Sequence, residues 1–255
     1  MIIIMLGGQA RVGKTTLAKW ISEYAFNQGY TPMILPFAAA LKEEAAKLGY
    51  SKDTNPLEYR EFCQVLGSEK RKEDSNYWVN RFRNRVTEIY NAEQVALKED
   101  PDTWHEKAVI VDDCRYLNEV AAARDLRALT IFISPGTRKL VDHGADWRNH
   151  ESEAMANMVD GGHKDYTELF NYRIYNEGTE EQFRAKCFGR FEEWFSVVSE
   201  GLVEDLCECE ICVSSRQDRP PDAGRVMKEI IDTLNGITGE TNDKSKRKRS
   251  KDSDS

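Results

Sequence analysis

Short apolar runs alternate with longer amphipathic stretches along the chain up to about residue 203. The apolar runs predict β-strands at Ile2–Leu6, Pro32–Phe37, Ala108–Asp112, Leu129–Ser134 and Tyr172–Tyr175. Apolar residues near a 3.6-residue period predict helices at Lys14–Gln28, Ala38–Leu48, Leu57–Leu66, Asn76–Leu97, Leu117–Leu126 and Glu180–Val203. Such alternation is typical of βαβ units, so we expect an α/β fold in which helices flank a parallel central sheet.

Two segments break this pattern. Residues 135–162 are polar, rich in Gly, His and Asn, and too long for an ordinary connection, so we expect a mobile lid there. After Val203 the chain becomes charged and Ser-rich and ends in KSKRKRSKDSDS. We therefore expect a domain over residues 1–203 and a largely disordered tail over residues 204–255, with one short helix possible at Arg225–Leu234.

Composition is that of a soluble globular protein, with 40% hydrophobic residues, 31% charged residues and a formal net charge of −8. The first apolar run is too short for a signal peptide or a membrane span, so we expect a cytoplasmic protein without membrane contact. Scattered Cys63, Cys114 and Cys187 suit buried, reduced thiols. The net acidity argues against a general nucleic-acid surface, for which the KRKR run is the only support.

The tail also holds a cysteine cluster in the stretch CECEIC, formed by Cys207, Cys209 and Cys212. Three thiols fall short of the four ligands of a closed zinc site, so we expect no tightly bound zinc in the monomer. A site shared between two subunits is the alternative. The sequence leaves open whether the protein forms a homodimer.

The stretch GGQARVGKTT, residues 7–16, follows the first predicted strand and opens the first predicted helix. It fits the phosphate-loop pattern G-x-x-x-x-G-K-[ST] through Gly8, Gly13, Lys14 and Thr15, and Thr16 follows. In such a loop, backbone N–H groups and the helix N-terminus hold phosphate oxygens, the lysine reaches the β- and γ-phosphates, and the hydroxyl can bind Mg²⁺. We therefore expect ATP and Mg²⁺ as cofactors.

Two acids lie at the carboxyl end of the third predicted strand and an arginine follows them, in the segment VIVDDCRYLNEV. This is the edge where a doubly wound sheet binds its ligand. One acid, Asp112 or Asp113, could organise Mg²⁺ or accept a proton, and Arg115 is suited to bidentate capture of a second phosphate. Alternatively, an acid caps the following helix and Arg115 is an ordinary surface charge.

Four separated segments resemble the deoxynucleoside monophosphate kinases of tailed bacteriophages, a branch of the P-loop nucleotide kinases. They are GGQARVGKTT, PFAAALKEEAAKLG, REFCQVLGSEKRKEDSNYWVNRF and VIVDDCRYLNEV, and the stretch NHESE in the expected lid is a fifth. The resemblance spans about residues 1–175. It implies a three-layer P-loop nucleoside monophosphate kinase-like fold with a lid insertion. The implied reaction transfers the ATP γ-phosphate to a deoxynucleoside monophosphate (dNMP), for phage DNA precursor synthesis in the host cytoplasm.

The second and third of these segments imply acceptor contacts. Family members have Phe-Ala-Asp-Pro-Leu-Lys where this chain has Phe37 to Lys42, and both of these end residues are implied to line the acceptor pocket. Ala39 and Ala40 replace the Asp and Pro, so an acidic contribution is lost or moved. The phosphate-binding arginine corresponds to Arg71 and the following aromatic to Trp78.

Spacing leaves the arginine assignment open, because the distance from Gly67 to Arg71 is one residue shorter than expected. Lys70 or Lys72 is therefore the alternative contact. Trp78 has two readings as well, a core residue or a platform for the base. An aromatic at the position of Phe37 can likewise face the core or stack on a base.

The fourth segment matches the family's Asp-x-Arg-x-x-Asn-Glu pattern through Asp113, Arg115, Asn118 and Glu119. The match implies that Asp113 is the catalytic acid, shares Mg²⁺ with Thr15, and stands beside the acceptor-phosphate clamp Arg115. The last two residues of the pattern are implied to contact substrate. The lid stretch matches His-x-Ser-Glu through His150, Ser152 and Glu153.

Two lid arginines, Arg138 and Arg148, are candidates for cationic clamps that close over the phosphates. They could equally form a solvated face, and His150 could be a base, a ligand or neither. Two other functions share parts of these features. A kinase of another small molecule, such as dephospho-coenzyme A, would share the loop and the lid, and a nucleic-acid-associated P-loop ATPase would share only the loop.

Overall fold

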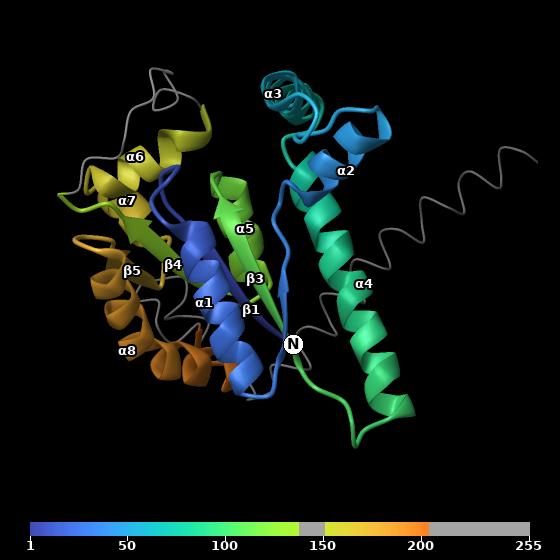
Figure 1. Cartoon of the computed structure of the whole chain (residues 1–255), viewed down its shortest axis with the longest axis vertical. Helices are drawn as coiled ribbons and strands as arrows, with labels where there is room; N and C mark the ends of the chain where they lie inside the picture. The colour runs from blue at the N-terminus through green and yellow to red at the C-terminus, as the bar shows by residue number, and fades with distance from the viewer. Residues whose placement is uncertain (138–150, 204–255) are drawn as a thin grey trace, which may run out of the picture. The chain divides into compact units, whose positions relative to one another are not determined.

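Five parallel strands form one central sheet in the computed structural model, which describes residues 1–137 and 151–203 (Figure 1). The strands are β1 (Ile2–Gly7), β2 (Thr31–Ile34), β3 (Lys107–Cys114), β4 (Leu129–Ser134) and β5 (Tyr172–Tyr175). Their spatial order is β2-β3-β1-β4-β5, and all four pairings are parallel. The predicted α/β fold with a parallel central sheet is confirmed.

Helices occupy most of the chain between the strands. They are α1 (Lys14–Asn27), α2 (Ala39–Lys47), α3 (Pro56–Glu73), α4 (Tyr77–Glu99), α5 (Leu117–Asp125), α6 (Ala154–Asp160), α7 (Lys164–Thr167) and α8 (Glu180–Ser199), with a 3-10 helix, η2 (Glu151–Glu153). All of the helices predicted within the described residues are present. The helices α6, α7 and η2 were not predicted. No helix among the described residues has the length and apolar character needed to cross a membrane.

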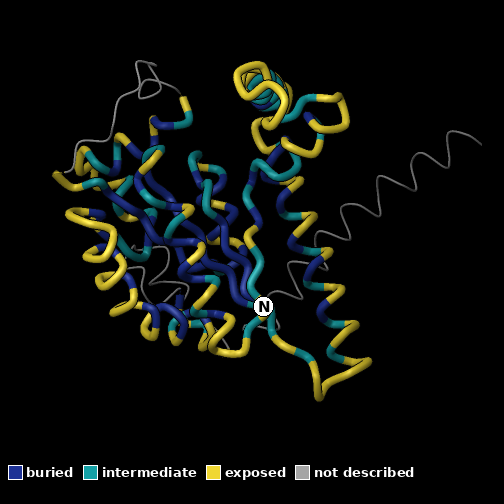
Figure 2. The backbone as a smooth tube through the Cα atoms, viewed as in Figure 1, coloured by how far each residue is buried: buried dark blue, intermediate teal, exposed yellow. Residues whose placement is uncertain are grey.

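Helices cover both faces of the sheet. Helix α1 packs along β2 and β3, and α8 packs beside it on β1 and β4, whereas α4 and α5 lie on the opposite face (Figure 1). The sheet is the most deeply buried part of the molecule (Figure 2). Because the central strands β1 and β4 are buried along their whole length, they read as continuous apolar runs instead of alternating ones.

Helix α3 extends seven residues beyond its predicted end at Leu66, to Glu73. Asn55 caps its start, and three basic residues in its last turn complement the negative end of the helix dipole. The helix continues through Gly67, which lies where α4 approaches closely. The indole N–H of Trp78 donates to the Gly67 carbonyl at 3.1 Å.

The cysteines of the described residues are unpaired, as expected for reduced thiols. Cys114 and Cys187 are buried, and Cys63 is half-buried. Burial raises the pKa of Cys187 to about 12, so this thiol stays protonated and unreactive at neutral pH. The cysteine cluster at 207–212 and the predicted helix at 225–234 lie outside the described residues.

Candidate nucleotide site

The loop between β1 and α1 depends on two glycines with positive φ, 133° at Gly8 and 107° at Gly13. A Cβ atom on Gly8 would lie 2.4 Å from the carbonyl oxygen of Ile133, and one on Gly13 would lie 2.7 Å from Asn176 Nδ2. Neither position could therefore hold a larger residue without rearranging the loop. Asn176 also donates to the Val12 carbonyl at 2.8 Å, and no sequence motif pointed to this support from beyond β5.

Lys14, the first residue of α1, points back over the loop. Its Nζ donates to the carbonyl oxygens of Gly8 and Gln9, at 2.7 Å each, and the residue is 7% exposed. Burial, together with the nearby positive charge of Arg115, lowers the pKa of Lys14 to about 8, and nearby carboxylates oppose this shift. The ammonium is thus held close to the loop backbone, at the place where a phosphate group would require it.

Thr15 pairs with Asp112 at the start of α1. The hydroxyl group donates to the Asp112 carboxylate at 2.9 Å, which brings a hydroxyl and a carboxylate oxygen together at the carboxyl edge of the sheet. Among the described residues, no three His, Cys, Asp or Glu side chains cluster as a metal site. Mg²⁺ needs fewer protein ligands, commonly one or two carboxylates with phosphates and water, so the pair fits it. The expected pair of Thr15 with Asp113 is replaced here by Thr15 with Asp112.

Asp113 faces away from Thr15, toward the connection between β2 and α2. Its two carboxylate oxygens accept hydrogen bonds from the backbone N–H groups of Phe37 and Ala38, at 2.8 and 3.0 Å. Burial raises the pKa of Asp113, and the two N–H donors oppose that rise. Exposed Lys42 on α2 lies within electrostatic range of the same carboxyl. Asp113 therefore fixes the loop that leads into α2.

Arg115 lies just beyond β3 and contacts η2. Its Nη1 donates to Glu153 Oε1 at 2.7 Å and approaches Ser152 Oγ at 3.3 Å. The other oxygen of Glu153 accepts from the backbone N–H of Ala10 in the phosphate loop, at 2.8 Å. Arg115 and the loop are thus joined through one carboxylate, and this link was not foreseen from the sequence.

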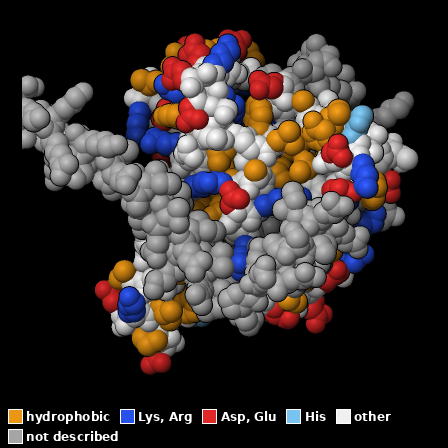
Figure 3. All heavy atoms as spheres, turned by 180° about the vertical axis from the view of Figure 1, so that it is seen from behind, with side chains coloured by type: hydrophobic (Ala, Val, Ile, Leu, Met, Phe, Trp, Pro, Cys, Tyr) orange, Lys and Arg blue, Asp and Glu red, His pale blue; other side chains and the backbone are white. Residues whose placement is uncertain are grey.

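A cavity of about 430 Å³ opens between the end of α3, the start of α5 and helix α6. Arg71 and Arg115 both line it, and the Arg71 guanidinium lies 4.1 Å from the ring centre of Tyr116. The remaining lining residues are Ser75, Leu117, Asn118, Glu151, Ala154, Met155, Met158 and Tyr166. The view from behind shows hydrophobic side chains gathered on one part of the described surface (Figure 3). The cavity thus combines a cationic end with apolar walls.

Asn118 lines this cavity, but its amide is already engaged. It donates to the Ser75 carbonyl oxygen at 2.7 Å and to Asn76 Oδ1 at 3.2 Å, both in the turn between α3 and α4. Asn118 therefore ties α5 to the turn that follows Arg71. Its contact with a substrate stays a prediction.

Glu119 is buried at 3% exposure. Its contact with a substrate stays a prediction. Its Oε2 accepts from the backbone N–H groups of Arg115 and Tyr116, at 2.7 and 3.1 Å, and so caps the start of α5. Burial, with the nearby charge of Asp113, raises the pKa of Glu119 to about 8. Glu119 therefore positions the backbone of Arg115.

This raised pKa makes the free energy of unfolding depend on pH. A folded-state pKa of about 8, against the ordinary value of 4.5 for a glutamate, means that the folded chain holds a proton that the unfolded chain releases between these values. Stability from this group is therefore complete below about pH 4.5 and is lost as pH rises toward 8. We expect Glu119→Gln to match the parent protein near pH 5 and to be more stable at pH 9, by on the order of a few kcal/mol.

Thermal unfolding midpoints of both proteins, measured at half-unit pH steps, check this expectation. The difference between them isolates Glu119 from other buried groups. A constant difference across the range would mean that the carboxyl is already ionised in the folded protein.

Two aromatic residues expected near the acceptor lie in the core. Phe37 is 3% exposed, and its ring centre lies 4.3 Å from that of Phe82. Trp78 is also 3% exposed, with its N–H bonded to Gly67. Neither ring offers a free face to a base, so the structure favours the core reading of both. Their apolar surface contributes more when buried in the core than when exposed at the site.

The remaining predicted site residues divide into two groups. Thr16 is the third residue of α1, directly after the loop. Arg138, Arg148 and His150 lie outside the described residues, which omit residues 138–150 of the expected lid. The described end of that segment is helical, in η2 and α6, and it brings Glu153 to the phosphate loop.

Comparison with known proteins adds no identification. No protein family model matches the chain, and no curated protein matches it with significant similarity.

Proposed function

We propose that this protein is a deoxynucleoside monophosphate kinase of the phage type, which transfers the γ-phosphate of ATP to a dNMP and yields the diphosphate and ADP. The observation that carries the proposal is the pair of cationic positions on one edge of the sheet. Lys14 stands over the phosphate loop, and Arg71 and Arg115 line the adjoining cavity. One phosphate position suffices for an ATPase, whereas a kinase of a phosphorylated acceptor needs two.

On this proposal, ATP is held by the backbone of residues 8–16 and by Lys14. Thr15 and Asp112 would hold Mg²⁺, which when bound neutralises charge on the β- and γ-phosphates. The Lys14 ammonium orients the terminal phosphates, and its loop contacts hold it in position before they bind. Preorganised charge of this kind needs little rearrangement during the reaction.

The acceptor would bind in the cavity of about 430 Å³. Arg115 and Arg71 would bind its phosphate, because a guanidinium matches phosphate oxygens with paired N–H groups. Met155, Met158 and Tyr166 form apolar walls suited to the sugar and the base. In this arrangement Asp113 supports the acceptor side through the loop into α2, and the fold is a three-layer nucleoside monophosphate kinase-like fold with a lid over residues 135–162.

A direct test measures ADP formation with Mg²⁺-ATP and a panel of deoxynucleoside and ribonucleoside monophosphates. We expect rapid ADP formation only when a dNMP is present. Stimulation by dephospho-coenzyme A instead would indicate the other small-molecule kinase. Full-speed hydrolysis without an acceptor, or stimulation by DNA, would refute the kinase proposal.

The acceptor role of Arg115 gives a separate prediction. Arg115→Ala should raise the KM for the acceptor and lower kcat, together costing about 10²- to 10³-fold in kcat/KM, because charge-assisted bonds that orient the attacking phosphate are lost. The Kd for ATP should change by a smaller factor than the acceptor KM. Arg85→Ala is the matched control, since Arg85 is exposed on α4 and pairs locally with Glu88 at 2.8 Å. An acceptor KM unchanged by Arg115→Ala would contradict the assigned role.

A further inference from the structure

Glu153 places a buried carboxylate between the phosphate loop and Arg115. Its Oε2 accepts from the Ala10 N–H at 2.8 Å and its Oε1 accepts from Arg115 Nη1 at 2.7 Å. The residue is 2% exposed. A single carboxylate group therefore bridges the loop, which is proposed to hold the donor, and the guanidinium, which is proposed to hold the acceptor.

The groups around this carboxylate are of the kinds that bind phosphoryl oxygens. Backbone N–H groups of a phosphate loop and an arginine guanidinium both bind phosphate, and a guanidinium binds carboxylate and phosphate in similar ways. Lys14 also lies within electrostatic range of both Arg115 and Glu153. A backbone donor and two cations thus converge on one anionic side chain.

We propose that the Ala10 N–H and the Arg115 guanidinium together form one anion subsite for an oxygen of the transferred phosphoryl group, and that Glu153 competes with that group for the subsite. This inference rests on the proposed function for the identity of the phosphoryl group. Phosphate binding must then break both Glu153 contacts, so the carboxylate weakens phosphate affinity. The same competition disfavours any anion that fits the loop but cannot make the contacts needed to displace Glu153.

A different role for Glu153 would give an effect of opposite sign. If the carboxylate served only to hold Arg115 and the loop in place, its neutralisation would loosen both and weaken anion binding. Competition predicts tighter binding instead. The sign of the change in affinity therefore separates the two roles.

The experiment measures the Kd of inorganic pyrophosphate by isothermal titration calorimetry, with the full chain and no acceptor. Glu153→Gln keeps the shape of the side chain and removes its charge, and we expect it to bind pyrophosphate about tenfold more tightly. The control is Glu168→Gln, which neutralises an exposed acid at the end of α7 and should change the Kd by less than about twofold. An unchanged or weaker affinity in Glu153→Gln overturns the proposal.

A double-mutant cycle tests the contribution of Arg115. In an Arg115→Ala background, Glu153→Gln should tighten pyrophosphate binding by less than about threefold, because half of the contested subsite is gone. A full tenfold effect in that background overturns the assignment of Arg115 to the subsite. Circular dichroism confirms that each variant is folded. If Glu153→Gln does not fold, Glu153→Asp retains the charge but shortens the reach, and it should also tighten binding.

This measurement is independent of the proposed function. Pyrophosphate binding needs neither ATP nor a dNMP, so the subsite can be confirmed even if the monophosphate panel shows no transfer. Conversely, active transfer to a dNMP combined with weaker pyrophosphate binding by Glu153→Gln would retain the kinase and refute the competition.

Discussion

Lys14→Ala is expected to reduce phosphate transfer by about 10²- to 10³-fold while the protein stays folded. The Nζ group donates to two loop carbonyl oxygens and stands where the β- and γ-phosphates are proposed to bind. Its removal takes away a positive charge fixed in a buried setting, where electrostatic interactions are stronger than in water. The loss should therefore appear in kcat, with a smaller change in the Kd for ATP.

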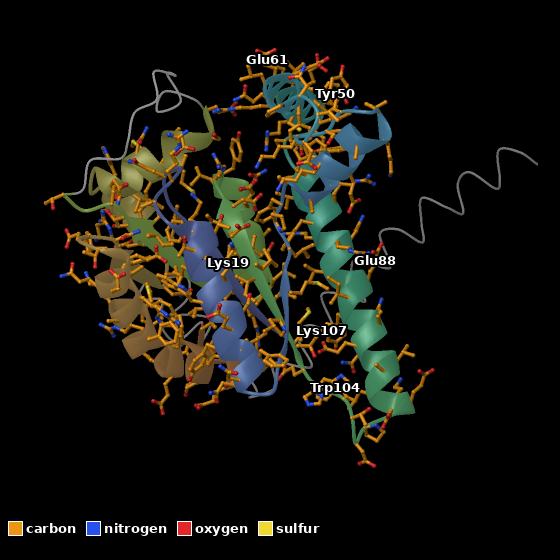
Figure 4. All side chains as sticks on the ribbon, in the orientation of Figure 1. Lys19, Tyr50, Glu61, Glu88, Trp104 and Lys107 are labelled. Atoms are coloured by element: carbon orange, nitrogen blue, oxygen red, sulfur yellow. The ribbon has the colours of Figure 1, made fainter. Side chains whose placement is uncertain are left out.

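Lys19→Ala is the matched control, because Lys19 lies on the exposed side of the same helix, away from the loop (Figure 4). Steady-state kinetics and thermal unfolding of both variants separate loss of function from loss of fold. A folded Lys14→Ala protein with near-normal turnover would show that the loop does not act on the reacting phosphate.

The two adjacent acids near the end of β3, Asp112 and Asp113, should give opposite results when substituted. We expect Asp112→Asn to raise the Mg²⁺ concentration needed for half-maximal activity about 10- to 100-fold, since its carboxylate pairs with Thr15. Its unfolding midpoint should stay within a few degrees of the parent. Asp113→Asn should instead cost about 1–3 kcal/mol of stability, because an amide NH₂ would face one of the two backbone N–H groups that the carboxylate now accepts.

Activity at varied Mg²⁺ and urea unfolding of the two variants check this division. Each variant acts as the control for the other, because both replace a carboxylate with its isosteric amide at neighbouring positions. If Asp113→Asn were the variant with the altered Mg²⁺ requirement, the metal role would belong to Asp113, as the family resemblance implied.

Sequence patterns predicted the layered frame well, because that frame follows from local rules. The runs Leu129–Ser134 and Tyr172–Tyr175 are strands with the predicted bounds. Elements with weaker periodicity were missed. The short apolar stretch that forms α6 lies inside a polar segment, and the extension of α3 past Gly67 depends on packing against α4.

The site was predicted only in part. The sequence gives the residue type at each position, but the direction in which a side chain points depends on the fold. Neighbouring residues on a strand point to opposite faces, so a sequence containing two adjacent acids cannot say which one meets Thr15. The same limit applies to Glu119, whose match to a substrate-contacting pattern gave no sign of its burial. Glu153 bridges Ala10, which lies 143 positions away in the sequence, and Arg115, which lies 38 positions away. No rule based on sequence spacing predicts contacts over such separations.

Because Asn176 lies far downstream of the phosphate loop in the sequence, its contact with the loop can form only late in the synthesis of the chain. Its amide holds the Val12 carbonyl across 164 positions of sequence and packs against Gly13. The glycine-rich motif is synthesised well before Asn176, so this support for the loop emerges only after β5. A nascent chain that stops before residue 176 would therefore carry the whole motif without its support, and such fragments should bind nucleotide poorly until the fifth strand joins the sheet.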